Sequence, residues 1–349
     1  MLNLGLRTRV GTVGAYTTGS NLDVVLQARE FIGAVTVSGR TGLGALGALA
    51  RRGELYGVDL DPACYLESPR AQGELFARDC EDDQRRLGLP IIRSAGSYVG
   101  RADLEALRHA FTTPVGAGTI RVISLHGGWL RLDALPNVLS FVRGSSDSLA
   151  FVLADPFDPL SARGAVDGLQ ELLAAASPDE RRVELLRTDI AGLGFAAAGG
   201  RFGAIGLSST TRHHSLPLGR NAGRDFERRR GTPKLFVPQL LSWQQGTVLG
   251  ALTPFGGAGL TECACVPCGG SDLLRFDQQW PGSVPEEIRA EARDHDLHSW
   301  GTLSTGVLAD SDPMLAWRSA CMAATRTTAE IADMYKVQLT IPESVRAWV

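Results

Sequence analysis

The sequence is poor in lysine, and it has neither an excess of positive charge nor a long hydrophobic run. Lys234 and Lys336 are the only lysines among 349 residues, so arginine carries nearly all of the positive charge. The formal net charge of −3 excludes a general attraction to nucleic acid, so any such binding must be local. No apolar stretch approaches the roughly 20 residues of a transmembrane helix, which argues against a membrane protein.

A secretory signal is also missing from the N-terminal residues, MLNLGLRTRV. We therefore expect a cytoplasmic protein whose cysteines are reduced. Three of the six cysteines, Cys64, Cys80 and Cys321, are dispersed along the chain and are expected to lie in the core.

The other three cysteines form the pattern C-x-C-x₂-C at Cys263, Cys265 and Cys268. Neighbouring cysteines in C-x-C cannot form a disulfide without strain, whereas closely spaced thiolates are good metal ligands. Zn²⁺ takes four nitrogen or sulfur ligands in a tetrahedron, and three cysteines with one histidine are a standard set. His295 and His298 follow on a helix predicted to begin near residue 285, and either can supply the fourth ligand.

The spacing of these residues resembles the zinc subdomain of the tRNA-guanine transglycosylase superfamily, including its relatives that insert 7-deazaguanine bases into DNA. In that family C-x-C-x₂-C precedes a helical His-Asn-Leu by about 26 residues, and here His295-Asp296-Leu297 stands at that distance. The resemblance makes His295 the preferred fourth ligand, with His298 as the alternative. It implies one structural Zn²⁺ and a (β/α)₈ barrel that carries the subdomain near its C-terminal end.

The alternation of short apolar segments with amphipathic helices independently predicts an α/β protein with a parallel sheet. Eight strand candidates favour a (β/α)₈ barrel over a doubly wound sheet, since no G-x-G-x-x-G follows the first of them. The candidates are residues 31–37, 55–60, 90–96, 120–126, 149–155, 182–189, 202–209 and 234–242.

Four segments follow from this assignment. They are an N-terminal cap of short strands (1–30), the barrel (31–258), the zinc-binding subdomain (259–305) and a helical tail (306–349).

In such a barrel the reacting groups lie at the C-terminal ends of the strands. Base exchange in a nucleic acid needs a carboxylate that holds the ribose anomeric carbon and a second acid that moves protons. Asp189 is the first choice for the nucleophile, with Asp59 or Asp61 as its partner. Arg187 has the same side-chain parity as Asp189 and is expected to keep it ionised. Asp155, Arg212 and His213 also stand at strand ends, and together with Arg187 they are expected to bind substrate.

Two parts of the family pattern are missing. The Asp-Ser-Gly-Gly-Phe-Gln stretch has its nearest counterpart in Ser38-Gly39, and residues 234–259 contain no Asp or Glu where the family's nucleophile stands. Two hypotheses remain open. The chain is a transglycosylase (a pentosyltransferase) that exchanges guanine for a 7-deazaguanine in tRNA or DNA, with its catalytic acids elsewhere. Alternatively, it is a non-catalytic paralogue that binds nucleic acid or forms a homo- or heterodimer.

The most basic part of the chain is the segment 211–234, which holds seven Arg or Lys residues against two acids. In the predicted barrel it would lie over the rim that carries the strand ends. We expect Arg228, Arg229 and Arg230 to contact phosphates, which would make nucleic-acid binding sensitive to salt.

Overall fold

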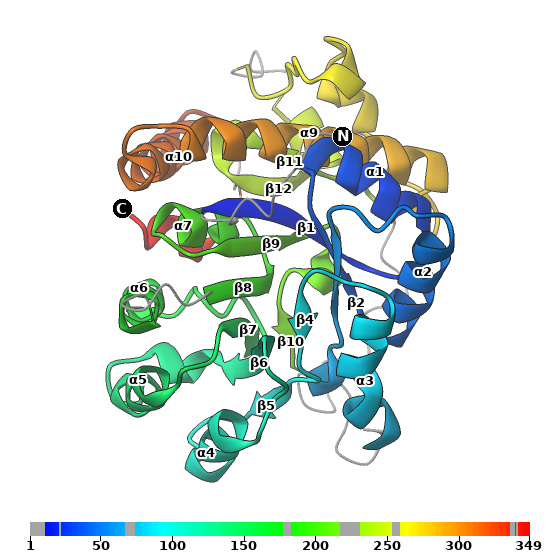
Figure 1. Cartoon of the computed structure of the whole chain (residues 1–349). Coiled ribbons are helices and arrows are strands. Elements are labelled where there is room, and N and C mark those ends of the chain that lie inside the picture. Colours follow the sequence, from blue (N-terminus) through cyan, green and yellow to red (C-terminus); the bar gives the residue numbers. More distant parts are fainter. Residues whose placement is uncertain are drawn as a thin grey trace. The chain divides into compact units, whose positions relative to one another are not determined.

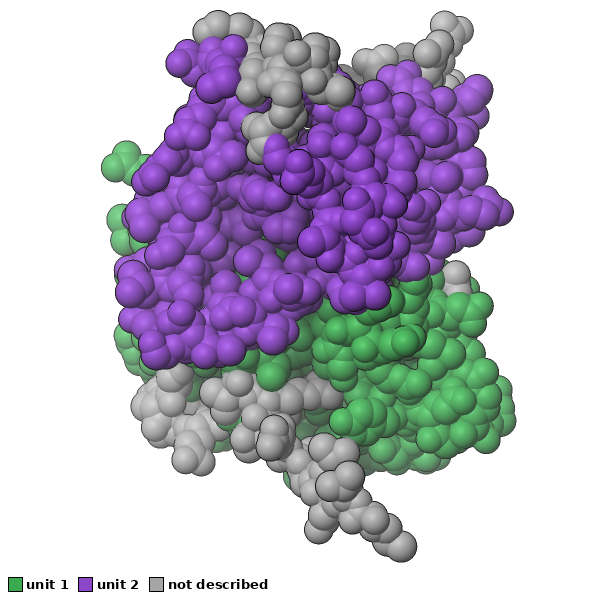
Figure 2. Space-filling model, turned by 90° about the horizontal axis from the view of Figure 1, so that it is seen from above, with its two compact units in different colours: residues 1–216 green, residues 217–349 purple. Residues whose placement is uncertain are grey.

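The computed structural model (Figure 1) describes residues 11–20, 22–66, 74–176, 183–216, 231–252, 259–335, 339 and 341–349. It divides into two compact units, residues 1–216 and residues 217–349, which are coloured separately in Figure 2. The finer division into cap, barrel, zinc subdomain and tail stays a prediction. Among the described residues, no helix is both long and apolar enough to span a membrane.

The first unit is built on a curled sheet of parallel strands (Figure 1). Eight strands follow one another in the order β3-β2-β1-β9-β8-β7-β6-β4, while β5 pairs with β6 and β10 pairs with β7. The strands are β1 (Thr12–Thr18), β2 (Val35–Ser38), β3 (Val58–Asp61), β4 (Ile92–Arg93), β5 (Ser97–Val99), β6 (Thr119–His126), β7 (Leu149–Asp155), β8 (Val183–Thr188), β9 (Phe202–Gly206) and β10 (His214–Ser215).

Helices connect successive strands and lie on the outer side of the curled sheet (Figure 1), as parallel strands require. Local sequence sets several of their ends; the Asp103 carboxylate, for example, accepts a hydrogen bond from the Ala106 amide at the start of α4. The helices are α1 (Leu22–Ile32), α2 (Gly39–Arg51), α3 (Glu74–Arg86), α4 (Leu104–Thr112), α5 (Leu135–Gly144), α6 (Ala165–Ala176) and α7 (Ala191–Ala197), with short 3₁₀ turns η1 (Cys64–Leu66), η2 (Gly127–Leu130) and η3 (Ser209–Thr211).

The predicted α/β fold with a parallel sheet is confirmed, but one strand was assigned wrongly. Residues 234–242 do not supply the eighth strand: Lys234–Val237 is β11, which pairs antiparallel with β12 (Ser242–Gln245) in the second unit. The sheet instead contains β1, from the segment expected to form a cap, and β1 pairs with both β2 and β9. Between β3 and β4, the two ends of the strand order, no strand pairing occurs within the described residues.

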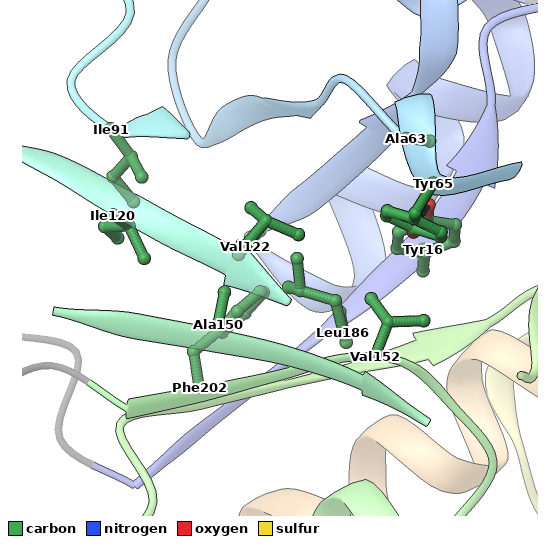
Figure 3. Close-up of a cluster of buried hydrophobic side chains, with 12 residues drawn as sticks. Tyr16, Ala63, Tyr65, Ile91, Ile120, Val122, Ala150, Val152, Leu186 and Phe202 are labelled. Carbon is green, nitrogen blue, oxygen red and sulfur yellow. Dashed lines mark hydrogen bonds between the residues drawn. The ribbon is translucent and has the colours of Figure 1, made fainter. Parts of the chain in front are cut away.

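The curled sheet carries a cluster of buried apolar side chains from β1, β6, β7, β8 and β9 and from the loops beside them. Figure 3 shows this cluster, with Tyr16 and Tyr65 together at one end. Its buried members include Ile120, Val122, Ala150, Val152, Leu186 and Phe202.

A fully buried ion-pair network lies among the strands of the same unit. The Arg93 guanidinium contacts Asp59 Oδ1 at 2.5 Å and Glu184 Oε2 at 2.6 Å, and Thr36 Oγ1 donates to Asp59 at 2.7 Å. Burial alone would lower the pKa of Arg93, but Asp59 and Glu184 raise it overall, so the guanidinium stays charged. Asp59, predicted as a catalytic partner, is thus part of a structural network; its catalytic role stays a prediction.

Replacing Arg93 by methionine should destabilise the protein strongly, because two buried carboxylates would lose their common counter-charge. We expect a loss of about 3–5 kcal/mol in the free energy of unfolding, measured by urea titration. The control is Arg52→Met, whose pair with Glu54 is largely exposed and should contribute no more than about 1 kcal/mol. Equal losses in both variants would contradict a structural role for the network.

The second unit combines the β11–β12 hairpin with two long helices, α9 (Glu286–Leu308) and α10 (Pro313–Tyr335). Its remaining elements are α8 (Gly246–Gly250), α11 (Glu343–Arg346) and the 3₁₀ turns η5 (Pro238–Leu240), η8 (Val266–Cys268) and η9 (Leu273–Phe276). Its apolar core includes Leu235, Val237, Leu249, Leu273 and Phe276, and Cys268 belongs to it.

Candidate metal centre and strand-end cluster

Four potential metal ligands meet in the second unit, and they are the four that the sequence predicts. One ligand atom from each of Cys263, Cys265, Cys268 and His295 lies within 4.8 Å of every other. The Nδ1 atom of His295 is 3.3, 3.5 and 3.4 Å from the three sulfur atoms in that order. A tetrahedral Zn²⁺ with its usual bond lengths would separate nitrogen and sulfur by about 3.6 Å, so the donor set fits such an ion.

The cysteines converge because the chain turns tightly around them. Cys265 precedes η8, and its carbonyl oxygen accepts hydrogen bonds from the amides of Cys268 and Gly269, both at 3.1 Å. Gly269 and Gly270 have φ of 56° and 82°, a left-handed conformation that suits glycine, and they lead the chain away after the last cysteine. The Cys265 amide also donates to Cys263 Sγ at 3.4 Å. The sulfur atoms therefore share one side of the turn.

The histidine is oriented by the β11–β12 hairpin. His295 Nε2 donates to the Phe236 carbonyl oxygen at 2.8 Å, which leaves the Nδ1 lone pair directed at the cysteines. The next residue, Asp296, accepts hydrogen bonds from the Phe236 amide at 2.6 Å and from Trp243 Nε1 at 2.7 Å. His298, the alternative ligand, lines a groove beside the centre but lies outside the four-residue group.

In the metal-free chain burial favours the neutral form of these ligands. It raises the pKa of the Cys263 and Cys265 thiols and lowers the pKa of His295. A metal ion binds thiolates, so binding would release protons. The apparent metal affinity should therefore fall as the pH falls.

A second group of polar side chains surrounds Asp61 at the C-terminal end of β3. The fully buried carboxylate accepts hydrogen bonds from Tyr16 Oη at 2.7 Å, Tyr65 Oη at 2.6 Å and the Ala63 amide at 3.0 Å. Burial first, and the charge of Asp61 second, raise the pKa of both tyrosines, so both remain hydrogen-bond donors. Three hydrogen-bond donors therefore surround this one carboxylate.

Arg187 reaches this group through a break in the regular strand. The register of β8 against β9 shifts between Leu185 and Thr188, and Arg187 has φ of 56°, a strained conformation for a residue other than glycine. Its guanidinium lies 5.8 Å from the centre of the Tyr16 ring and donates to the carbonyl oxygens of His213 and Thr210 at 2.9 and 2.5 Å. This register shift is a bulge in β8. It interrupts the alternation of side chains between the two faces of the strand, on which the predicted Arg187–Asp189 pairing was based.

His214 lies beside the same group, on β10. Its imidazole is 5.5 Å from the Tyr65 ring and 5.3 Å from the Tyr98 ring, and Nδ1 is 2.9 Å from Ser124 Oγ. Burial, with smaller effects from Arg187 and His213, lowers the pKa of His214 to about 4, so the ring is neutral at neutral pH. Sequence reasoning missed Tyr16, Tyr65 and His214, although the adjacent His213-His214 pair is visible in the sequence.

Several predicted substrate and catalytic residues do come together. Arg187, Asp189, Arg212 and His213 line one small cavity, together with Asp158. Asp189 Oδ1 accepts a hydrogen bond from the Ala191 amide at 2.8 Å.

The remaining predicted residues lie elsewhere. Asp155 Oδ1 accepts a hydrogen bond from the Phe157 amide at 3.1 Å, as expected for a turn after a strand. Asp59 belongs to the Arg93 network. Arg228, Arg229 and Arg230 lie outside the described residues.

Comparisons with family models and with curated proteins found no match to this chain.

Proposed function

We propose that this protein is a transglycosylase that exchanges guanine for a 7-deazaguanine base in tRNA or DNA, with one structural Zn²⁺. The observation that carries the proposal is the Asp61 carboxylate, buried at a strand end and held by two tyrosine hydroxyls. A buried strand-end carboxylate surrounded by hydrogen-bond donors suits an enzyme that must exchange protons with a purine-like base. The Cys₃His group supports the proposal because its spacing resembles that of the same superfamily.

The two carboxylates have different surroundings, which suggests different roles. Asp61 has three hydrogen-bond donors and no exposed surface, so we assign it to proton transfer and to recognition of the base. Asp189 lines a cavity with Arg187 and Arg212, so we assign it as the nucleophile that holds the ribose carbon after the base leaves.

The proposal includes a closed (β/α)₈ barrel. Two observations support closure: β9 pairs with β1, and hydrogen bonds cross from β3 and the residues after it to the β4 region. Arg93 Nη1 donates to the Leu60 carbonyl oxygen at 3.1 Å, and the Cys64 amide donates to the Ala95 carbonyl oxygen at 3.1 Å. In a closed barrel the strand ends of Asp61 and Asp189 would share one rim. The basic composition of the segment 211–234 supports contact with nucleic-acid phosphates.

One observation favours the second candidate, a non-catalytic nucleic-acid-binding or dimerising paralogue. His214 lies against Tyr65 and Tyr98, and the neighbouring Asp61 has no exposed surface. A substrate base could reach Asp61 only if some of the side chains that bury it moved. A paralogue without base exchange would not need that movement.

The test is incubation of the metal-loaded protein with tritiated guanine, or a tritiated 7-deazaguanine base, and with tRNA or duplex DNA. Base exchange predicts label in one polymer after precipitation, and omission of the polymer provides the control. If folded, metal-loaded protein labels neither polymer but binds one in a salt-dependent way, the non-catalytic candidate is favoured.

A further inference from the structure

The two sides of the metal centre differ in their surroundings. On one side Cys268 is buried, and Arg275 Nη2 donates to its sulfur atom at 3.0 Å. Arg275 is itself held in place, because Nε donates to Glu291 Oε1 at 2.6 Å and Nη1 donates to the carbonyl oxygens of Ser271 and Asp272. A charged hydrogen bond to a thiolate withdraws electron density from sulfur, so this thiolate is the least nucleophilic when metal is bound.

On the other side, Cys263 and Cys265 are partly exposed and line a groove of about 420 Å³, enough for a small organic molecule. The donor to Cys263 is a neutral backbone amide at 3.4 Å, far weaker than the guanidinium on Cys268. The groove walls are mainly apolar, with one carboxylate and one imidazole outside the ligand set. They include Leu260, Glu262, Val266, Leu273, His298 and Leu303.

We propose that Cys263 and Cys265 form a modification site for neutral, apolar thiol-directed electrophiles, and that Arg275 protects Cys268 from the same reaction. The apolar walls favour an uncharged reagent, and Glu262 disfavours an anionic one. With a maleimide, the thiolate sulfur attacks one alkene carbon, a carbon–sulfur bond forms, and the resulting enolate takes a proton from water. The thioether product is a poor ligand, so the metal is released. This inference depends on the metal centre alone and not on base exchange.

The experiment treats the full-length, zinc-loaded protein with limiting N-ethylmaleimide. Adducts are located by peptide mass spectrometry, and released zinc is followed with a chromogenic indicator. We expect zinc release to accompany adducts at Cys263 or Cys265, and Cys268 to react roughly tenfold more slowly, as expected from one charged hydrogen bond. Iodoacetamide should also react faster than the anionic iodoacetate. The ratio of these two rates should be larger for the protein than for a free cysteine peptide.

Arg275→Gln should narrow the difference in N-ethylmaleimide reaction rate between Cys268 and the other two cysteines. The matched control is Arg289→Gln, because Arg289 pairs with Glu286 at the exposed start of α9 and should leave the difference unchanged. Equal reactivity of all three cysteines in the parent protein, or earliest reaction at Cys268, would overturn the proposal, whether or not Arg275→Gln folds. Purified protein without zinc would overturn it as well, while failure of base exchange alone would leave it standing.

Discussion

Replacing Cys265 by serine should remove the zinc and unfold the second unit. Three ligands lie within residues 263–268 and the fourth lies on α9, and Cys268 is also a member of that unit's apolar core. Structural zinc in small domains contributes roughly 10 kcal/mol or more of binding free energy at neutral pH, comparable with the roughly 5–15 kcal/mol that stabilises a typical domain. Loss of the metal is therefore expected to remove most of the stability of this unit.

Elemental analysis and thermal unfolding measure this effect. The parent protein should contain about one zinc per chain, and Cys265→Ser should lose it and melt at a lower temperature. Cys321→Ala is the matched control, since Cys321 is buried on α10 of the same unit outside the ligand group, and this variant should keep its zinc. A metal-free parent protein that melts no lower than the metal-bound one would refute a structural role for the metal.

The second large effect is expected for Asp61→Asn, which should reduce base exchange by several orders of magnitude. The substitution keeps the volume of the side chain but removes the charge and one of the two acceptor oxygens. Both tyrosine hydroxyls donate to Oδ2 and the Ala63 amide donates to Oδ1, so the new amide nitrogen deprives either the two hydroxyls or the Ala63 amide of an acceptor. The expected cost is about 1–3 kcal/mol in stability. The expected result is a folded protein with a lower melting temperature and almost no label transfer.

Three comparisons make this result specific. Asp189→Asn should also abolish exchange if Asp189 is the nucleophile, whereas Asp133→Asn changes an exposed acid and should leave exchange intact. If Asp61→Asn transfers label normally per folded molecule, Asp61 has a structural role only. If Asp61→Asn is inactive but Asp189→Asn is fully active, the nucleophile is a different residue.

The sequence predicted most of the fold because buried parallel strands are visible as short apolar runs between helices. It placed β1 in a cap of short strands and not in the sheet, because Thr12, Gly14 and Thr17 dilute the apolar pattern of that strand. Gly14 is needed there: a Cβ atom at this position would lie 2.7 Å from the Phe202 ring. The error at residues 234–242 has a related cause, since an apolar run does not tell whether its partner strand is parallel or antiparallel.

The two candidate sites differ in how well the sequence predicted them. The metal ligands were predictable because three of them lie within six residues and the spacing to the fourth is characteristic. The Asp61 group was not, because Tyr16 precedes Asp61 by 45 residues and Arg187 reaches Tyr16 only through a bulge. Residue spacing assumes a regular strand, and a left-handed residue inside β8 breaks that assumption.

The shared contacts of Phe236 have a consequence for chain entropy. Its carbonyl oxygen accepts a hydrogen bond from His295 and its amide donates one to Asp296, so two consecutive residues of α9 hold both backbone polar groups of one residue of β11. When His295 also binds a metal ion, three distant points of the chain are joined at one place, as in a branched cross-link. The entropy cost of closing the loops between such points grows only slowly with their length. Insertions between Cys268 and His295 that leave the Gly231–Trp280 bridge intact should therefore be tolerated far better than any change in the spacing of the cysteines.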